Sequence, residues 1–291
     1  MKKKRILLLG GKSGLLGVSL FYMWKDDHQL ELIVHGKEDF DVLDFKELSH
    51  YLHDVCPDVI VNTVSFNQIN LAEQKTQQAF LINEHLLEPI INFSKEKNTY
   101  LIHFSTYMVF DGKKGTPYSE EDEPCPINVF GRSKLKGEQR ILESFLQNYL
   151  IIRTSWLFGK YGYNFVNDLI ELIKRDKKII ACHNKVIAPT YTNDLAQFSL
   201  ELIKKNVQGI VNITNSGYAT LCEIAQEIVR ITGVKCVVEP KVVADKNDYN
   251  LAPLPDYGVL DLSKLIKILG KKPRSWMLAL RDYLFSIEGI M

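Results

Sequence analysis

The sequence predicts an α/β protein with a Rossmann-type, doubly wound parallel sheet and a smaller α/β region at its C-terminal end. Short apolar runs alternate with amphipathic segments over the first 155 residues, as in parallel strands covered by helices on both faces. A glycine-rich turn separates the first apolar run from the first amphipathic one. After Trp156 the alternation loosens, so we expect one domain over residues 1–155, to which later segments can return, and a second region over 156–291.

The N-terminal elements follow from the two periodicities. Strands buried on both faces are apolar throughout, whereas helices that cover a sheet show an apolar stripe. The apolar runs predict strands at Ile6–Leu9, Leu30–Val34, Val59–Val64, Tyr100–Phe104 and Tyr149–Arg153. The amphipathic segments predict helices at Leu15–Trp24, Phe45–Val55, Ala72–Lys97 and Gly131–Gln147.

The C-terminal elements are more irregular. Thr220, followed by Glu223, is a capping-box signature that opens a helix running to about Ile231. The stretch Glu239–Gly258 contains three prolines and no periodicity, which predicts a long loop. We expect the remaining helices at Asn164–Lys174, Asn193–Lys205, Ser263–Leu269 and Trp276–Phe285.

The bulk composition excludes several classes of function. The 36 basic and 35 acidic residues nearly cancel, which argues against nucleic acid or an anionic membrane as partner. The five cysteines lack metal-ligand spacing, so we predict no metal site and expect buried, reduced thiols. The apolar run after Arg5 stops at Gly10, too short for a signal peptide, and no run approaches the ~18 residues of a membrane span. These features predict a soluble, cytoplasmic protein.

The turn after the first strand has the spacing Gly11-x-x-Gly14-x-x-Gly17. Glycines there permit a tight turn and let the backbone approach a pyrophosphate at the N-terminus of the following helix. This predicts that residues 1–155 bind a dinucleotide. The end of the second strand, Ile33-Val34-His35-Gly36-Lys37, lacks the Asp or Glu with which an NAD site usually holds the ribose 2′-hydroxyl, whereas Lys37 could meet a 2′-phosphate. The sequence therefore favours NADP and leaves NAD open.

A second constellation joins Ser105-Thr106 to Phe130 and Lys134. The i,i+4 spacing places Phe130 and Lys134 on one face of the helix. A large class of nicotinamide-dependent reductases has tyrosine at the first of these positions, because an adjacent ammonium lowers the pKa of the phenol and lets it protonate a substrate oxygen. Phenylalanine has no proton to give. The sequence therefore predicts a reductase site without its usual acid.

Motifs along nearly the whole chain resemble one family. They include Val109-Phe110-Asp111-Gly112, Gly131-x-Ser133-Lys134-x-x-Gly137-Glu138, Arg153-Thr154-Ser155-Trp156, Asn164-Phe165-Val166 and Pro189-Thr190-Tyr191. With the glycine turn, this set resembles the dTDP-4-dehydrorhamnose reductases, extended members of the short-chain dehydrogenase/reductases. The resemblance implies reduction of the 4-keto group of a nucleotide-linked 6-deoxyhexose by NAD(P)H, in dTDP-rhamnose biosynthesis, with residues 156–291 as the substrate-binding region.

The resemblance also implies roles for individual positions. The pyrophosphate would lie on the glycine turn, which consists of Gly11, Lys12, Ser13, Gly14, Leu15, Leu16 and Gly17. Two further cofactor contacts are implied, to the adenine from Asp41 and Val42 and to the nicotinamide ribose from Asn83 and Lys134. Thr106 would bind the substrate carbonyl, and the sugar nucleotide would lie near Met108, Trp156 and Asn164.

Departures from the family pattern gather where the chemistry takes place. Tyr107 replaces the family's Asp, Met108 replaces a substrate-facing Tyr, and Phe130 replaces the catalytic Tyr. One interpretation is an active reductase in which Tyr107 or an ordered water supplies the proton, although Tyr107 could also be a buried aromatic of the core. The alternative is a catalytically silent member that binds the cofactor and acts as a binding or regulatory subunit. A homodimer or a partner protein stays open in either case.

Overall fold

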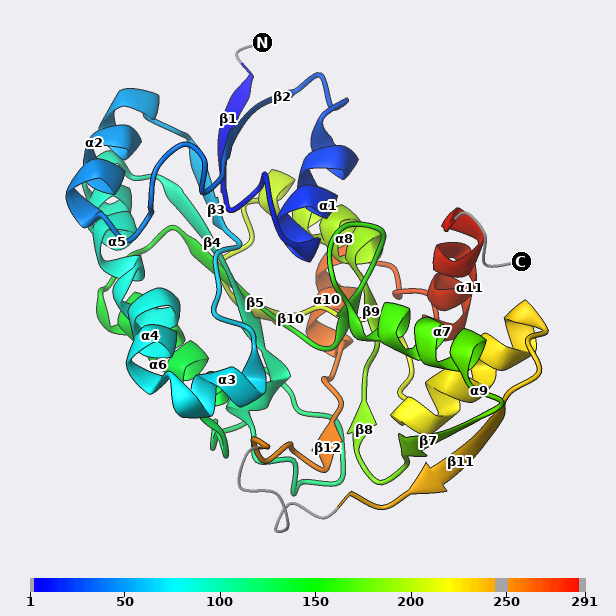
Figure 1. Cartoon of the computed structure of the whole chain (residues 1–291). Coiled ribbons are helices and arrows are strands. Elements are labelled where there is room, and N and C mark those ends of the chain that lie inside the picture. Colours follow the sequence, from blue (N-terminus) through cyan, green and yellow to red (C-terminus); the bar gives the residue numbers. More distant parts are fainter. Residues whose placement is uncertain (1–2, 244–250, 288–291) are drawn as a thin grey trace.

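A computed structural model describes residues 3–243 and 251–287 of the chain (Figure 1). Its main feature is a six-stranded sheet in the order β10-β5-β4-β3-β1-β2, in which every neighbouring pair is parallel. The strands are β1 Lys4–Leu9, β2 Leu30–His35, β3 Val59–Asn62, β4 Tyr100–Thr106, β5 Tyr149–Thr154 and β10 Gly209–Asn212. The predicted Rossmann-type parallel sheet is confirmed.

The strand order reverses next to β1. From β1 the chain first adds β2 on one side and then β3, β4 and β5 on the other. In open α/β sheets such a reversal leaves a crevice at the carboxyl ends of the strands, where ligands bind. The register brings the carboxyl ends of neighbouring strands to one edge, since Leu9 pairs with Asn62 and Thr106 with Thr154. The topology therefore predicts a ligand site at this edge of the sheet.

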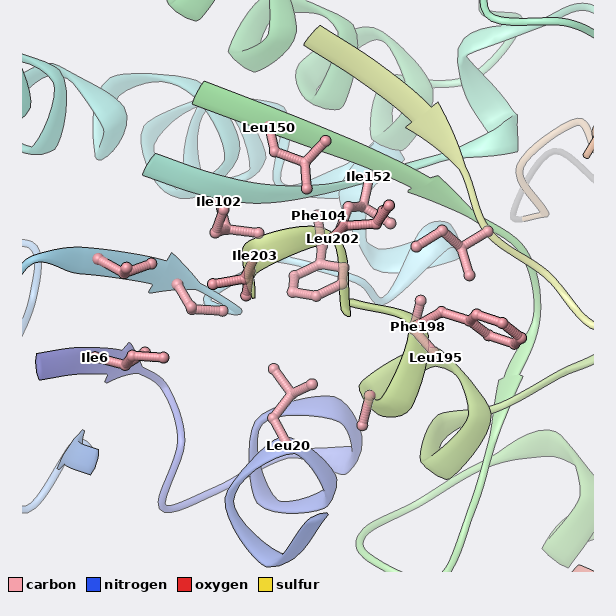
Figure 2. Packing of buried hydrophobic residues seen from close by; sticks show 14 of the residues in the cluster. Ile6, Leu20, Ile102, Phe104, Leu150, Ile152, Leu195, Phe198, Leu202 and Ile203 are labelled. Atoms are coloured by element: carbon pink, nitrogen blue, oxygen red, sulfur yellow. The ribbon is translucent and has the colours of Figure 1, made fainter. Parts of the chain in front are cut away.

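Helices cover both faces of the sheet (Figure 1). One layer contains α1 Leu15–Trp24, α8 Thr192–Lys204 and α10 Ser263–Leu269; the other contains α2 Phe45–Val55, α5 Leu87–Lys97 and α6 Val129–Glu143. Figure 2 shows side chains of the first layer, including Leu20 of α1 and Leu195 of α8, packing onto Ile102 and Phe104 of β4. The opposite face of β4 buries Leu101 against α2 and α5. This double coverage explains why the strands are mostly apolar.

The C-terminal region has a core of its own. It packs α7 Phe165–Arg175, α9 Leu221–Thr232 and α11 Trp276–Ser286 beside the parallel pair β7 Lys178–Cys182 and β11 Val237–Lys241. The predicted capping box at Thr220 and Glu223 is confirmed. Two short parallel pairs, β6 Leu157–Phe158 with β9 Thr190–Tyr191 and β8 Val186–Ile187 with β12 Tyr257–Gly258, contribute Phe158, Ile187 and Tyr191 to this core. Because α8 and β10 return to the main sheet, the boundary at 155/156 stays a prediction.

The predicted continuous helix over Ala72–Lys97 is wrong. The segment forms α3 Ile69–Gln74, α4 Thr76–Phe80, a π-helix Leu81–His85 and then α5. Lys75 interrupts the first two with φ −115° and ψ 49°. The π-turn packs closely against α6, because a Cβ added at Gly137 would lie 2.4 Å from the Asn83 carbonyl oxygen. The helical segment is thus interrupted where it packs against α6, and the apolar periodicity did not indicate this interruption.

Two other expectations need correction. The predicted loop Glu239–Gly258 begins inside β11 and ends in β12, while its residues 244–250 lie outside the described part of the chain. The five free thiols are not all buried: Cys222 is, but Cys56 and Cys125 are exposed. Across residues 3–243 and 251–287, no helix combines the length and the apolar character needed to cross a membrane.

Candidate active site

The glycine turn lies at the carboxyl end of β1. A Cβ added at Gly17 would come within 2.3 Å of the Gly10 carbonyl oxygen, so only glycine lets α1 pack this closely on the turn. Gly14 has φ +83°, and an added Cβ there would meet no described atom within 4 Å. No side chain caps α1 and its first turn contains no acid. The open space beside Gly14 and the uncapped N-terminus of α1 fit a pyrophosphate.

Two acidic residues, Glu38 and Asp39, follow the end of β2 and contact Lys12 of this turn. Lys12 Nζ lies 2.6 Å from Asp39 Oδ1 and 3.7 Å from Glu38 Oε1. Asp39 Oδ2 also accepts a 2.8 Å hydrogen bond from the Gly36 N–H. The Lys12–Asp39 hydrogen bond raises the pKa of Lys12 and lowers that of Asp39. Sequence reasoning missed Asp39 because it follows the strand by several residues, whereas Lys37 is exposed as expected.

The residues expected to contact adenine lie between β2 and α2. Asp41 is exposed, and its Oδ1 accepts a 3.0 Å hydrogen bond from the Leu43 N–H. Val42 is half-buried and packs on the α2–α5 side of the sheet. Asp41 therefore shapes the turn that leads into α2, and a contact of either residue with adenine stays a prediction.

Asn83 has its hydrogen-bonding capacity filled by the protein. Its Oδ1 accepts from the Ser65 hydroxyl at 3.0 Å and the Phe66 N–H at 2.9 Å. Its Nδ2 donates to the Phe66 carbonyl at 3.1 Å and to Ser133 Oγ at 2.8 Å. These four bonds use both lone pairs and both N–H groups of the amide. Asn83 ties the segment after β3 to α6, and its predicted contact with a nicotinamide ribose stays a prediction.

Thr106 is the last residue of β4 and begins the segment on which α6 packs. Its Oγ1 accepts a 3.2 Å hydrogen bond from the Met108 N–H and caps the 3₁₀ helix Tyr107–Val109. The first turn of α6 packs directly on that helix, since a Cβ at Gly131 would lie 2.1 Å from the Met108 carbonyl oxygen. Glycine at 131 thus permits the close approach that brings the start of α6 to the end of β4. Met108 itself is buried.

Phe130 and Lys134 are both buried, with 8% and 2% of their surfaces exposed. Lys134 Nζ lies 3.2 Å from Nε2 of His103 on β4. Burial lowers the pKa of Lys134 to about 7, although the charge of Glu138 opposes this. Burial and the Lys134 charge lower the pKa of His103 well below its usual value. The site therefore holds a lysine that titrates near neutral pH beside a phenylalanine that cannot titrate.

Tyr107 fills the space between Trp156 and Gly258. Its hydroxyl accepts a 2.8 Å hydrogen bond from Trp156 Nε1. A Cβ at Gly258 would lie 2.2 Å from the Tyr107 ring, so the ring requires glycine at that position. Burial raises the pKa of Tyr107, which weakens it as an acid. Trp156 adopts an unusual φ of +34°. Nothing in the sequence indicated Gly258.

Asn164 organises the loop before α7. Its Oδ1 accepts from the Asn167 N–H at 3.3 Å, and its Nδ2 donates to the Gly159 carbonyl at 2.9 Å. This loop approaches the glycine turn, because a Cβ at Gly162 would lie 3.2 Å from the Leu15 backbone nitrogen. Asn164 therefore shapes a segment next to the expected pyrophosphate site, and its direct contact with substrate stays a prediction.

Three hydroxyls at the carboxyl ends of β4 and β5 are buried without a hydrogen-bond partner in the described structure: Ser105, Thr154 and Ser155. Buried hydroxyls nearly always have a partner, from the protein, from water or from a ligand. Thr154 pairs in register with Thr106, so this group adjoins the predicted catalytic residues. The three hydroxyl oxygens are themselves buried, so a bound molecule could reach them only if the surrounding side chains moved.

Comparison with known proteins identifies the family. The profile of the family described as RmlD substrate binding domain matches residues 4–288. The chain belongs to this family. The spore coat polysaccharide biosynthesis protein SpsK of Bacillus subtilis (strain 168) is 31% identical over 278 residues, covering 96% of each chain. The dTDP-4-dehydrorhamnose reductase of Aggregatibacter actinomycetemcomitans is 28% identical over 286 residues, covering 95% of this chain and 97% of the relative.

A solved structure of the family extends the comparison to three dimensions. The dTDP-4-dehydrorhamnose reductase of Bacillus anthracis str. Ames, in complex with NADP, matches with a TM-score of 0.92 at 27% identity. The match covers 98% of this chain and 100% of that one. The resemblance expected from the sequence motifs is therefore confirmed.

Proposed function

We propose that the protein is an NADP-dependent reductase of the 4-keto group of a nucleotide-linked 6-deoxysugar. The observation that carries this proposal is the placement of the glycine turn, Thr106 and Lys134 around the carboxyl ends of β1 and β4. Family relatives named dTDP-4-dehydrorhamnose reductase, one of them solved with NADP, support the choice of substrate and cofactor. A cytoplasmic location and a homodimer or protein partner stay predictions.

Separate residues bind the cofactor, bind the substrate carbonyl and exclude water. When bound, the reduced nicotinamide supplies a hydride. The N-terminus of α1, open at Gly14, binds the pyrophosphate. Thr106 Oγ1, at the end of β4, hydrogen-bonds the substrate carbonyl. The buried side chains of Met108 and Phe130 line the sugar side and exclude water.

The cofactor preference gives a first prediction. NADPH should bind more tightly than NADH because Lys12 and Lys37 can face a 2′-phosphate. Asp39 holds Lys12 at 2.6 Å and opposes a phosphate, so Asp39→Asn should increase the preference for NADPH roughly two- to fivefold. Lys12→Met should decrease it. Calorimetric titration with both reduced cofactors measures the ratio, with exposed Lys46→Met as the matched control. Tighter binding of NADH by the unmodified protein would contradict the preference.

A second prediction concerns the sugar nucleotide and tests the proposed function. Met108 and Phe130 stand where the family has phenols, so two hydroxyls are missing from one pocket. A buried polar group left without a partner costs about 1–3 kcal/mol, hence a dTDP-4-keto-6-deoxysugar should bind weakly, above micromolar Kd. Titration with the cofactor present measures this. Met108→Tyr should tighten binding, whereas absence of any binding at millimolar concentration would refute the proposed substrate class.

A further inference from the structure

Lys134 is buried and titratable, but the phenol whose pKa such a lysine usually lowers is absent from this chain. In reductases with a tyrosine one turn earlier, this lysine lowers the pKa of the phenol, but Phe130 has no phenol. Lys134 is nevertheless 2% exposed, with its Nζ 3.2 Å from His103 Nε2. Burying an ammonium is costly unless it is paired or loses its proton. The structure therefore favours release of the proton from this side chain.

The neighbouring hydrogen bonds favour the neutral amine. Asn62 Oδ1 accepts from the Val64 N–H at 3.1 Å, which turns Asn62 Nδ2 towards His103 Nδ1 at 3.4 Å. An amide nitrogen only donates, so His103 Nδ1 accepts and the neutral ring carries its proton on Nε2. That N–H points at Lys134 Nζ and requires a lone pair there. An amine has one, and an ammonium has none.

Charges on the packed elements do not reverse this preference. Glu138, one turn along α6, is bound by Arg153 through contacts of 3.0 and 2.7 Å. On α3, Glu73 accepts a 2.7 Å hydrogen bond from the Val129 N–H. The other titratable groups on the described elements that pack against α6 are Tyr107 of the 3₁₀ helix, Tyr100 of β4, Glu84 and His85 of the π-helix, and Glu88, Lys95, Glu96 and Lys97 of α5. Glu84, His85 and Glu88 all contact Arg140. Burial dominates, and the pKa of Lys134 falls to about 7.

We propose that Lys134 itself supplies the proton to the substrate carbonyl oxygen, through one bridging water, and that His103 stabilises the amine left behind. The carbonyl carbon gains the hydride from the reduced nicotinamide, which is oxidised, and the C=O π pair becomes a lone pair on oxygen. That oxygen forms an O–H bond as one N–H bond of Lys134 breaks through the water, leaving the electron pair on Nζ. This inference rests on the proposed function.

The first arm of the test needs neither cofactor nor turnover. Nuclear magnetic resonance of protein labelled at lysine and histidine follows each titration, and Lys134→Met assigns the Lys134 signal. We expect a Lys134 midpoint near pH 7, and above it a neutral His103 protonated on Nε2. His103→Phe removes the donor and should raise the midpoint by about one unit, whereas His103→Gln keeps a donor and should restore it. Lys136→Met, at an exposed position on the same helix, should change nothing.

The second arm is the pH dependence of single-turnover hydride transfer. A general acid must be protonated, so the rate should fall about tenfold per pH unit above the measured midpoint. Lys134→Arg, which holds its proton, should be slow and independent of pH. A Lys134 midpoint above pH 9, or turnover that does not fall with pH, would overturn this inference and leave the proposed function standing. A neutral midpoint without any hydride transfer would overturn the proposed function and the inference with it.

Discussion

Phe130→Tyr is expected to raise the single-turnover rate of 4-keto-sugar reduction by about 10²-fold, the lower end for a positioned general acid. The new phenol would stand one helical turn from Lys134, and the protonated form of Lys134, which is populated below its pKa of about 7, lowers the pKa of the phenol. Thr106 remains at the end of β4 to orient the carbonyl. The rate is measured as oxidation of NADPH at saturating sugar nucleotide.

Further variants distinguish three proton donors: the phenol introduced at position 130, Lys134 and Tyr107. Phe130→Tyr combined with Lys134→Met should lose most of the gain, because the phenol then keeps an ordinary pKa. Tyr107→Phe should leave the rate of the unmodified protein within about twofold, since burial raises the pKa of Tyr107 and its hydroxyl is bound by Trp156. If Tyr107→Phe abolishes turnover, then Tyr107 is the donor. If no variant turns over, a binding role becomes the better account.

Arg153→Met is expected to destabilise the fold by about 3–5 kcal/mol, as does breaking a buried ion pair from one side. Arg153 and Glu138 are 2% and 1% exposed and meet through two contacts of 3.0 and 2.7 Å. The guanidinium also lies 5.1 Å from the centre of the Phe110 ring. Removing it would leave the Glu138 carboxylate buried and unpaired between β5 and α6.

Urea unfolding measures this loss. The double variant Arg153→Met with Glu138→Leu should recover most of the stability, because no lone charge remains. Arg140, on the same helix as Glu138, is partly exposed and contacts Glu84 and Glu88 at 3.2 and 3.3 Å. Arg140→Met should therefore lower the free energy of unfolding by less than about 1 kcal/mol. A loss below 1 kcal/mol for Arg153→Met would contradict the buried-pair interpretation.

Much of the sheet was predictable because its strands are buried on both faces. The run Ile6–Leu9 in β1 is wholly apolar, the run Tyr100–Phe104 in β4 is apolar except for His103, and the glycines after β1 mark the turn. The edge strand β10 was missed because it is short and follows a region of weak periodicity. The break between Ala72 and Lys97 was missed because it depends on contact between the Asn83 carbonyl and Gly137, residues far apart in sequence.

The candidate site was predictable in its residue types more than in its contacts. Spacing indicated that Phe130 and Lys134 share a helix face, and the resemblance supplied Thr106. No pattern indicated that Tyr107 would require glycine at 258 or that His103 would meet Lys134, because each contact joins separate elements. Asp39 does not follow from the usual dinucleotide-binding pattern, because that pattern places the acid at the end of the strand and Asp39 lies in the turn after β2.

The most direct measurement of the central claim is isotope transfer from the cofactor. The unmodified protein is incubated for hours with dTDP-4-keto-6-deoxysugar and NADPH carrying deuterium at nicotinamide C4, and the sugar is analysed by mass spectrometry. We expect one deuterium at sugar C4, a slower yield than from Phe130→Tyr, and none from Lys134→Met over the same time. If both ligands bind and neither the unmodified protein nor Phe130→Tyr transfers deuterium, the protein is not a reductase of this substrate.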